Sequence, residues 1–211
     1  MTAYLYLHGF ASSPQSSKAR YLRDRFAEQD LHLEVLDLNQ GDFTHLTLTR
    51  QIQQTVGAFP DSKTPVTLIG SSFGALTAAW VAQQHQVKNL VLLAPAFGFP
   101  HSWYSRLSCE QIEQWHNSGY LPVYHYGAAK QIPLHYQFLK DADNYPLSGL
   151  KRSLDTLIIH GINDDVVPIQ VSRDYRNQHS QVKLVELNSD HGLNDVQAEI
   201  WHLIRDFLNL T

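Results

Sequence analysis

With 211 residues, of which 43% are hydrophobic and 17% charged, the chain can form a full core and is not a disordered polymer. Its net charge of −4 and the absence of any basic run leave no sign of nucleic-acid binding. No apolar run nears the roughly 20 residues that cross a bilayer. The chain opens with no signal-peptide pattern and Cys109 is its one cysteine, so we expect a cytoplasmic protein.

The first half of the chain alternates predicted strands with predicted helices. Aliphatic and aromatic runs predict strands over residues 3–7, 33–36, 66–69 and 90–93. Apolar residues at helical spacing predict a first helix, capped by Ser16 or Ser17, and a second over residues 48–59. This alternation is typical of a parallel sheet whose faces are covered by helices.

An aromatic-rich stretch interrupts the alternation after Pro95. Residues 97–145 hold 11 of the chain's 23 aromatic residues. We expect short helices over 109–115 and 134–140, within a helical lid insertion over about 97–150. Ligand pockets are mostly apolar and aromatic, so we expect some of these side chains, such as Trp103, Trp115 and Tyr124, to line a substrate site. The alternative is that they only form a small core within the insertion.

The alternation returns in the last third of the chain. Strands are predicted over residues 156–161 and 182–187, with a helix from Pro168 through Tyr175 between them. A strong amphipathic pattern over 196–208 predicts a C-terminal helix. We therefore expect one α/β domain over residues 1–211. Its sheet has about six mostly or wholly parallel strands, with helices on both faces.

A short glycine–serine motif joins the third predicted strand to the helix that follows. Gly70-Ser71-Ser72-Phe73-Gly74 has the G-x-S-x-G pattern of a nucleophile elbow. The turn is so tight that its outer positions need glycine, and it holds Ser72 in a strained conformation at a helix N-terminus. Because the pattern also occurs in turns without chemistry, partner residues must support it.

Two later loops supply such partners. A serine hydroxyl becomes a good nucleophile when a histidine takes its proton, and an acid behind the histidine fixes its tautomer. Asp164 follows the fifth strand and His191 follows the sixth, so both emerge at the sheet edge that carries Ser72. We expect Ser72, Asp164 and His191 to form a catalytic triad.

Backbone amides near Ser72 can form an oxyanion hole. A tetrahedral intermediate needs two aimed N–H donors. One is the N–H of Phe73, directly after the nucleophile, and the other belongs to Phe10 or to Ala11 in the first loop. Gly9 allows that loop to approach closely.

The remaining polar residues indicate no second chemical site. The 12 histidines show no H-x-H, H-x-x-x-H or H-E-x-x-H spacing and one cysteine forms no cluster, so we expect no metal and no cofactor. His8 and His160, at strand ends, are interpreted as structural. Asp165, Asp190 and Asp195 are weaker candidates for the acid, Asp165 because it abuts the segment that leads into the next helix.

Taken together, these motifs resemble a known family. Residues 6–14, Tyr-Leu-His-Gly-Phe-Ala-Ser-Ser-Pro, followed by Ser17-Lys18-Ala19, closely resemble the opening of the small bacterial YqiA-like esterases of the α/β-hydrolase superfamily. The elbow resembles that of the same family. The loops at residues 160–168 and 190–192 resemble the acid and histidine loops of esterases. Two features depart from the pattern: Ala75 stands where many elbows carry another glycine, and the insertion is longer than in the shortest relatives.

The resemblance implies the α/β-hydrolase fold, with the strand order 2-1-3-4-5-6 and without the first two antiparallel strands of its larger members. It also implies a serine esterase acting on a small acyl ester or thioester. Ser72 attacks, His191 takes and returns the proton, Asp164 orients His191, and water hydrolyses the acyl-enzyme. Three alternatives stay open: an acyl-CoA thioesterase, a C–C hydrolase or lyase on the same scaffold, and a ligand-binding homologue without turnover. The acyl chain, the leaving group and the oligomeric state also stay open.

Overall fold

A six-stranded sheet forms the centre of the computed structural model, which describes residues 2–61 and 63–210. All of its strand pairs are parallel, in the order β2-β1-β3-β4-β7-β8. The predicted fold class and strand order are therefore confirmed. The strands are β1 (Ala3–Leu7), β2 (Leu33–Leu36), β3 (Val66–Ser71), β4 (Asn89–Leu93), β7 (Thr156–Gly161) and β8 (Val182–Leu187).

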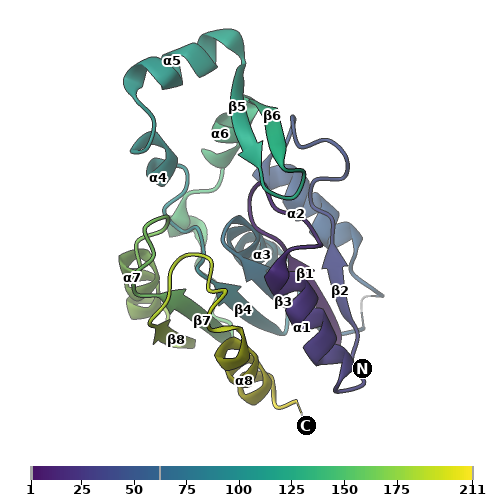
Figure 1. Cartoon of the computed structure of the whole chain (residues 1–211). Helices are drawn as coiled ribbons and strands as arrows, with labels where there is room; N and C mark the ends of the chain where they lie inside the picture. The colour runs from purple at the N-terminus through teal and green to yellow at the C-terminus, as the bar shows by residue number, and fades with distance from the viewer. Residues whose placement is uncertain (1, 62, 211) are drawn as a thin grey trace.

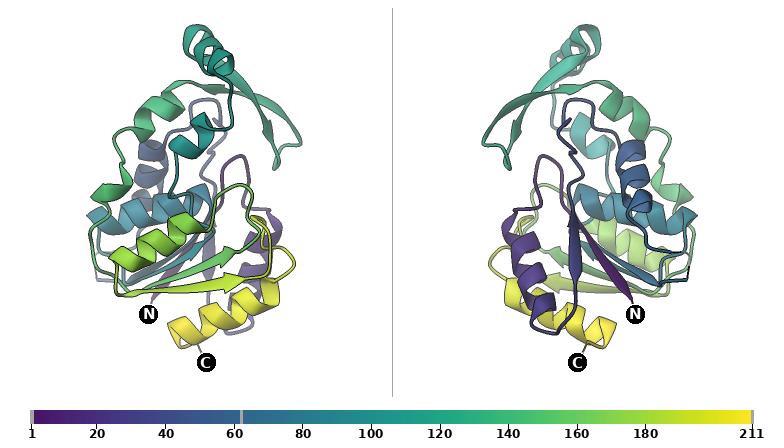
Figure 2. Two further views of the ribbon diagram at one scale, coloured as in Figure 1. Left: turned by 90° about the vertical axis from the view of Figure 1, so that its left-hand side faces the viewer. Right: turned by 90° about the vertical axis from the view of Figure 1, so that its right-hand side faces the viewer.

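Helices cover both faces of this sheet (Figures 1 and 2). On one face lie α1 (Ser17–Ala27) and α8 (Gln197–Leu208), whose buried residues form one apolar cluster with the sheet. On the other lie α2 (Leu48–Gly57), α3 (Phe73–Gln84) and α7 (Gln170–Gln178), which share a second and larger cluster. Helices α1 and α8 each bury an apolar stripe, as their sequence spacing predicts.

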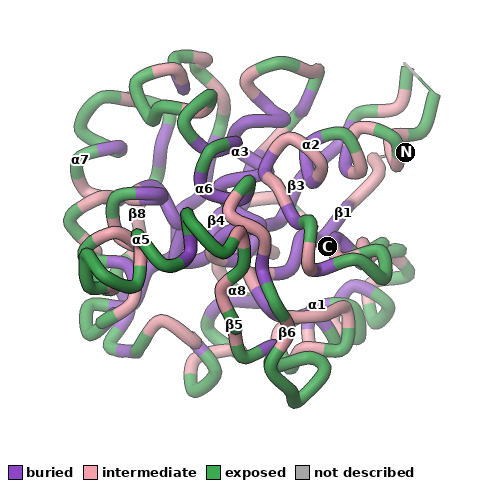
Figure 3. Tube along the Cα trace, turned by 90° about the horizontal axis from the view of Figure 1, so that it is seen from above, coloured by how far each residue is buried: buried purple, intermediate pink, exposed green. Residues whose placement is uncertain are grey.

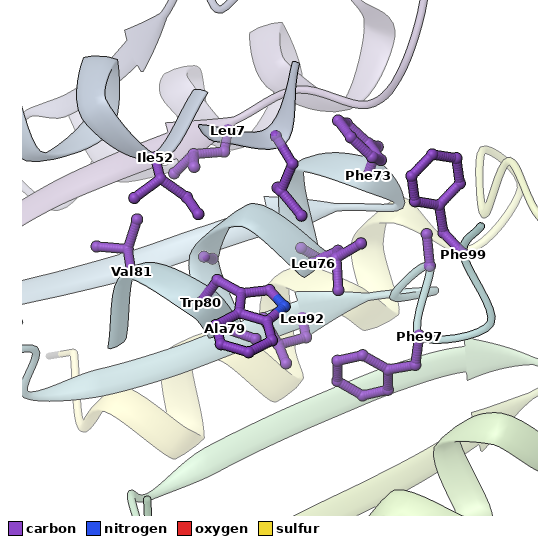
Figure 4. Packing of buried hydrophobic residues seen from close by; sticks show 14 of the residues in the cluster. Leu7, Ile52, Phe73, Leu76, Ala79, Trp80, Val81, Leu92, Phe97 and Phe99 are labelled. Atoms are coloured by element: carbon purple, nitrogen blue, oxygen red, sulfur yellow. The ribbon is translucent and has the colours of Figure 1, made fainter. Parts of the chain in front are cut away.

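The helix α3 is the most deeply buried of the helices, and Figure 3 shows how burial concentrates at the centre of the fold. Every residue from Phe73 to Ala82 is buried. Figure 4 shows Leu76 and Trp80 of this helix within the core, with Leu7 of β1 and Ile52 of α2 among the packed residues. The residue that precedes α3 is therefore held on a rigid support.

Side-chain caps explain where three of the helices begin. Ser16 Oγ accepts a hydrogen bond from the Ala19 N–H at 3.4 Å, which makes Ser16 the cap of α1. Thr47 caps α2 in the same way. Ser108 and Gln111 form a capping box at the start of α5 (Cys109–Ser118), so the helix predicted over 109–115 is present and three residues longer.

The insertion between β4 and β7 stands above the sheet in Figure 1. It contains α4 (His101–Tyr104), α5, β5 (Tyr120–His125), β6 (Lys130–His135), α6 (Gln137–Ala142) and the 3₁₀ turn η1 (Leu147–Gly149). Strands β5 and β6 pair as an antiparallel hairpin, so the insertion is not purely helical. The insertion lies over the edge of the sheet at which the strands end, and some of its residues share a cavity with Ser72 and His191 (Figure 1).

The helix predicted over residues 134–140 is wrong at its start. Leu134 and His135 belong to β6, and α6 begins at Gln137. Leu134 pairs with Leu121 of β5, is fully buried, and accepts a hydrogen bond from Trp115 Nε1 at 2.9 Å. These tertiary contacts override the local helical spacing of the apolar residues. No helix of the described residues is long and apolar enough to cross a membrane.

Candidate active site

The turn between β3 and α3 has the predicted elbow geometry. Ser72 has φ +54° and ψ −113°, a conformation that L-residues rarely adopt. A Cβ atom on Gly70 would lie 2.6 Å from the Cα of Ala75, and one on Gly74 would lie 2.3 Å from the carbonyl oxygen of Leu7. Both outer positions of the motif therefore require glycine, as expected from the sequence.

Ser72, His191 and Asp164 form one hydrogen-bonded chain. His191 Nε2 lies 3.0 Å from Ser72 Oγ, and His191 Nδ1 lies 2.7 Å from Asp164 Oδ2. A carboxylate can only accept from Nδ1–H, which leaves Nε2 free to accept the proton of the serine hydroxyl. The elbow, the loop after β7 and the loop after β8 thus bring together the three side chains predicted from the sequence.

Asp164 is fully enclosed by hydrogen-bond donors. Its Oδ1 accepts from the amides of Val166 and Val167 at 2.8 and 2.7 Å, and its Oδ2 accepts from His191 and from His160 Nε2 at 3.1 Å. Burial alone would raise the pKa of this carboxyl. The bonds from His160, His191 and Val167 outweigh burial and hold its pKa below the usual range, so Asp164 is charged.

The three other carboxylates considered from the sequence make different contacts. Asp165 is exposed. Asp190 is also exposed, and its Oδ1 accepts from the Leu193 amide at 3.1 Å. Asp195 accepts a hydrogen bond from the hydroxyl of Ser189. None of them bonds to an imidazole, whereas Asp164 does.

Two buried histidines at strand ends behave differently. His8 Nε2 accepts from the Leu38 amide at 3.1 Å, and burial lowers the pKa of the ring, so it joins β1 to the loop after β2 as a neutral group. This fits the structural interpretation. His160 Nδ1 lies 2.8 Å from Ser172 Oγ, but its Nε2 also reaches Asp164. The sequence analysis missed this contact. The four-residue spacing from His160 to Asp164 is no signal for it, because that spacing brings side chains together on helices, whereas these residues lie in β7 and in the loop after it.

Free backbone amides lie beside the serine. The N–H groups of Phe10, Ala11 and Phe73 have no acceptor within hydrogen-bonding distance among residues 2–61 and 63–210. A Cβ atom on Gly9 would lie 3.5 Å from Ser72 Cβ, so the first loop packs directly against the elbow. The amides that we predicted for an oxyanion hole are therefore unpaired and near Ser72.

A cavity of about 810 Å³ opens above Ser72 and His191. Its walls come from the first loop, the elbow, the insertion and the loop after β7. Six aromatic side chains line it: Phe10, Phe73, Phe99, Trp103, Tyr124 and Tyr126. Trp103 and Tyr124 are where we expected them, but Trp115 is not. Trp115 is fully buried under the hairpin, where the alternative of a core role applies.

The described part of the chain offers no cluster of metal ligands. No three side chains of His, Cys, Asp or Glu gather there closely enough to hold an ion. Cys109 is exposed at the start of α5. The residues around the cavity instead offer a hydroxyl nucleophile, an imidazole base and amide donors.

Residues 3–209 match the model of a family described as Uncharacterised protein family (UPF0227). No curated protein sequence is significantly similar to the chain. Three solved structures illustrate the likeness in fold. Alpha/beta hydrolase domain-containing protein 10 from mouse has a TM-score of 0.80 at 20% identity, covering 98% of this chain and 89% of that one. Est1E from Butyrivibrio proteoclasticus, with ferulic acid bound, gives 0.82 at 18%, covering 99% and 88%. A structure from work on the metagenome-derived lipolytic enzymes LipS and LipT gives 0.76 at 19%, covering 99% and 93%.

Proposed function

The chain belongs to the UPF0227 family and has the α/β-hydrolase fold, and from this premise we propose that it is a serine hydrolase that cleaves carboxylic or thio esters. One observation carries the proposal. His191 hydrogen-bonds on one side to Ser72 Oγ at 3.0 Å and on the other to the charged carboxylate of Asp164 at 2.7 Å. This is the arrangement in which an imidazole activates a serine.

The proposed reaction proceeds through an acyl-enzyme. His191 takes the proton of the Ser72 hydroxyl as its oxygen attacks the carbonyl carbon of the ester. The N–H groups of Phe73 and of Phe10 or Ala11 stabilise the negative charge on the former carbonyl oxygen. His191 then gives its proton to the leaving alcohol or thiol. Water then attacks the acyl carbon while His191 takes its proton. His191 returns that proton to Ser72 Oγ as the carboxylic acid leaves.

The cavity gives the proposal its substrate class. About 810 Å³ lies within the usual range for small-molecule sites, and apolar and aromatic side chains together form most of its walls. The names of two similar structures point the same way, since one mentions bound ferulic acid, a carboxylic acid, and the other mentions lipolytic enzymes. We propose that the insertion over residues 97–150 forms the lid of an acyl pocket.

Kinetics with simple esters test this function. We expect hydrolysis within a series of p-nitrophenyl esters of increasing chain length, with acyl-CoA esters measured alongside. Ser72→Ala should lower kcat by about 10³-fold or more, because triad members act as a unit. Ser71→Ala should cost much less, since Ser71 is buried beneath the elbow. An inactive Ser71→Ala beside an active Ser72→Ala would contradict the assignment, and circular dichroism checks that both variants fold.

A further inference from the structure

A lysine of α1 reaches the loop that carries His191. Lys18 Nζ donates a hydrogen bond to the carbonyl oxygen of Gly192, the residue directly after His191. The Lys18 side chain lies half-buried in a crevice between α1 and α8, beside Leu93 and Ile200. A lysine at the surface of α1 would be free to extend into water. This one instead ties the first helix to the histidine loop.

The charge of Lys18 is poorly compensated. No carboxylate of the described residues lies within 4 Å of its Nζ, and burial lowers its pKa to about 8. The carboxylates of Asp190 and Asp164 lie farther away but within Coulombic reach, and they favour the charged form. At neutral pH and below, the lysine is therefore a cation next to the histidine loop.

We propose that Lys18 is a positioning residue for His191: it fixes the histidine loop through the Gly192 carbonyl, and its positive charge disfavours protonation of the imidazole. The inference rests on the proposed function for its kinetic consequence. Asp164 has the opposite effect, because a carboxylate stabilises the imidazolium. The positive charge of Lys18 cancels part of this stabilisation, so His191 stays available as a base.

The other groups around Lys18 do not replace this effect. Asp190 is exposed and negative, so it favours the imidazolium as Asp164 does. From α8 the crevice receives uncharged Gln197 and apolar Ile200, from β4 it receives Leu93, and from α1 itself Tyr21. Among the described residues that line this crevice, Lys18 carries the only positive charge. On the other side of the loop, Arg106 lines the same cavity as His191, and it is unchanged in all the variants compared below.

Removing the charge should move the pH profile. Lys18→Met should shift the acid limb of kcat/KM to higher pH by about 0.3 unit or more, because removing a nearby positive charge makes protonation of the imidazole easier. It should also lower kcat/KM at pH 8 by about tenfold or more, since a looser histidine loop misplaces the base. Lys18→Gln also removes the charge and should shift the acid limb by the same amount. It replaces Lys18→Met in the test if Lys18→Met folds poorly. Lys18→Arg should keep the limb.

Arg20→Met is the matched control, because it removes a positive charge from the exposed side of the same helix. Its limb should coincide with that of the wild type. An acid limb at the wild-type pH in both Lys18→Met and Lys18→Gln would overturn the inference, even if activity fell. A purely structural role lowers activity without moving the limb. A shift of equal size in Arg20→Met would overturn it too.

A measurement without turnover separates this inference from the proposed function. The Cε1–H resonance of His191, assigned with His191→Gln, can be followed by NMR against pH in the wild type and in Lys18→Met. We expect the imidazole of the variant to titrate at higher pH. Identical titration curves would overturn the role of Lys18, whatever the activity. A wild type without Ser72-dependent turnover would contradict the proposed function alone.

Discussion

Asp164 and Asp165 are neighbours in the sequence with opposite surroundings. Asp164 is buried and receives four hydrogen bonds, one of them from His191. Asp165 is exposed at the rim of the cavity, where its backbone carbonyl accepts a bond from Arg106 at 2.5 Å. The difference supports the choice of Asp164 as the acid of the proposed triad.

Substituting each carboxylate tests that choice. Asp164→Asn should lower kcat by roughly 10²- to 10⁴-fold, because the amide can donate to Nδ1 and so favour the wrong tautomer of His191. Asp165→Asn keeps the backbone contact and should change kcat by less than about threefold. Steady-state kinetics on one ester decide between them, with thermal unfolding as the check on folding. Equal losses of kcat in the two variants, or a larger loss in Asp165→Asn, would contradict the choice of Asp164 as the acid.

Asp164 and His191 together determine how the proposed activity depends on pH. The pKa of Asp164 is held below its usual range, so this carboxylate stays charged throughout the range in which an imidazole titrates. The acid limb of kcat/KM should therefore come from the group that accepts the serine proton and not from Asp164. Asp164→Asn removes the charge that stabilises the imidazolium, so the limb of its residual activity should move to lower pH. A limb that moves to higher pH would show that Asp164 does not face His191 in the working enzyme.

Single residues were predictable where a motif fixes both residue type and place. Gly70, Ser72 and Gly74 follow from the sterics of one tight turn, and His191 follows from its loop at the same sheet edge. The contact of Lys18 with Gly192 was not predictable, because 174 residues separate the two and only the packing of α1 beside α8 brings them together.

At the scale of elements, the insertion separates pocket residues from core residues. Trp103 of α4 and Tyr124 of β5 line the cavity, whereas Trp115 of α5 is buried against Leu134. Trp103→Ala and Tyr124→Ala should therefore change the preference for ester chain length more than they change stability. Trp115→Ala should instead lower the free energy of unfolding by about 3–5 kcal/mol, because it leaves a cavity.

A chain-length series of esters and urea unfolding, run on all three variants, check this division. The account of the insertion is wrong if Trp103→Ala and Tyr124→Ala lower stability as Trp115→Ala does while the ester profile stays unchanged.

The predictability of an element depends on where its stabilising contacts lie. The six sheet strands are short aliphatic runs between turn residues, so their composition indicates them directly. The β5–β6 hairpin was missed because it contains Pro122 and Pro133, and proline is rare within strands. Its pairing depends on contacts with α5 that the local sequence does not show.

At the scale of the molecule, chain order determines the layout of the site. In a parallel sheet every strand ends at the same edge, so the loops after β1, β3, β7 and β8 meet there without any further signal. The strand order does not follow from this rule; it was expected from the resemblance to α/β-hydrolases. The position of the insertion over that edge was predictable only in outline, since nothing in the sequence states how α4, α5 and the hairpin pack on one another.

The central claim is that Ser72 is an activated nucleophile, and labelling by a fluorophosphonate followed by peptide mapping tests it most directly. The probe reacts only with a serine whose proton an adjacent base removes. We expect one adduct per chain, on the peptide that contains Ser72, and none in Ser72→Ala. Labelling of His191→Gln should be slower by at least about 10²-fold, while Ser71→Ala should be labelled as the wild type is. An unlabelled wild type, or an adduct that persists on another serine in Ser72→Ala, would contradict the claim.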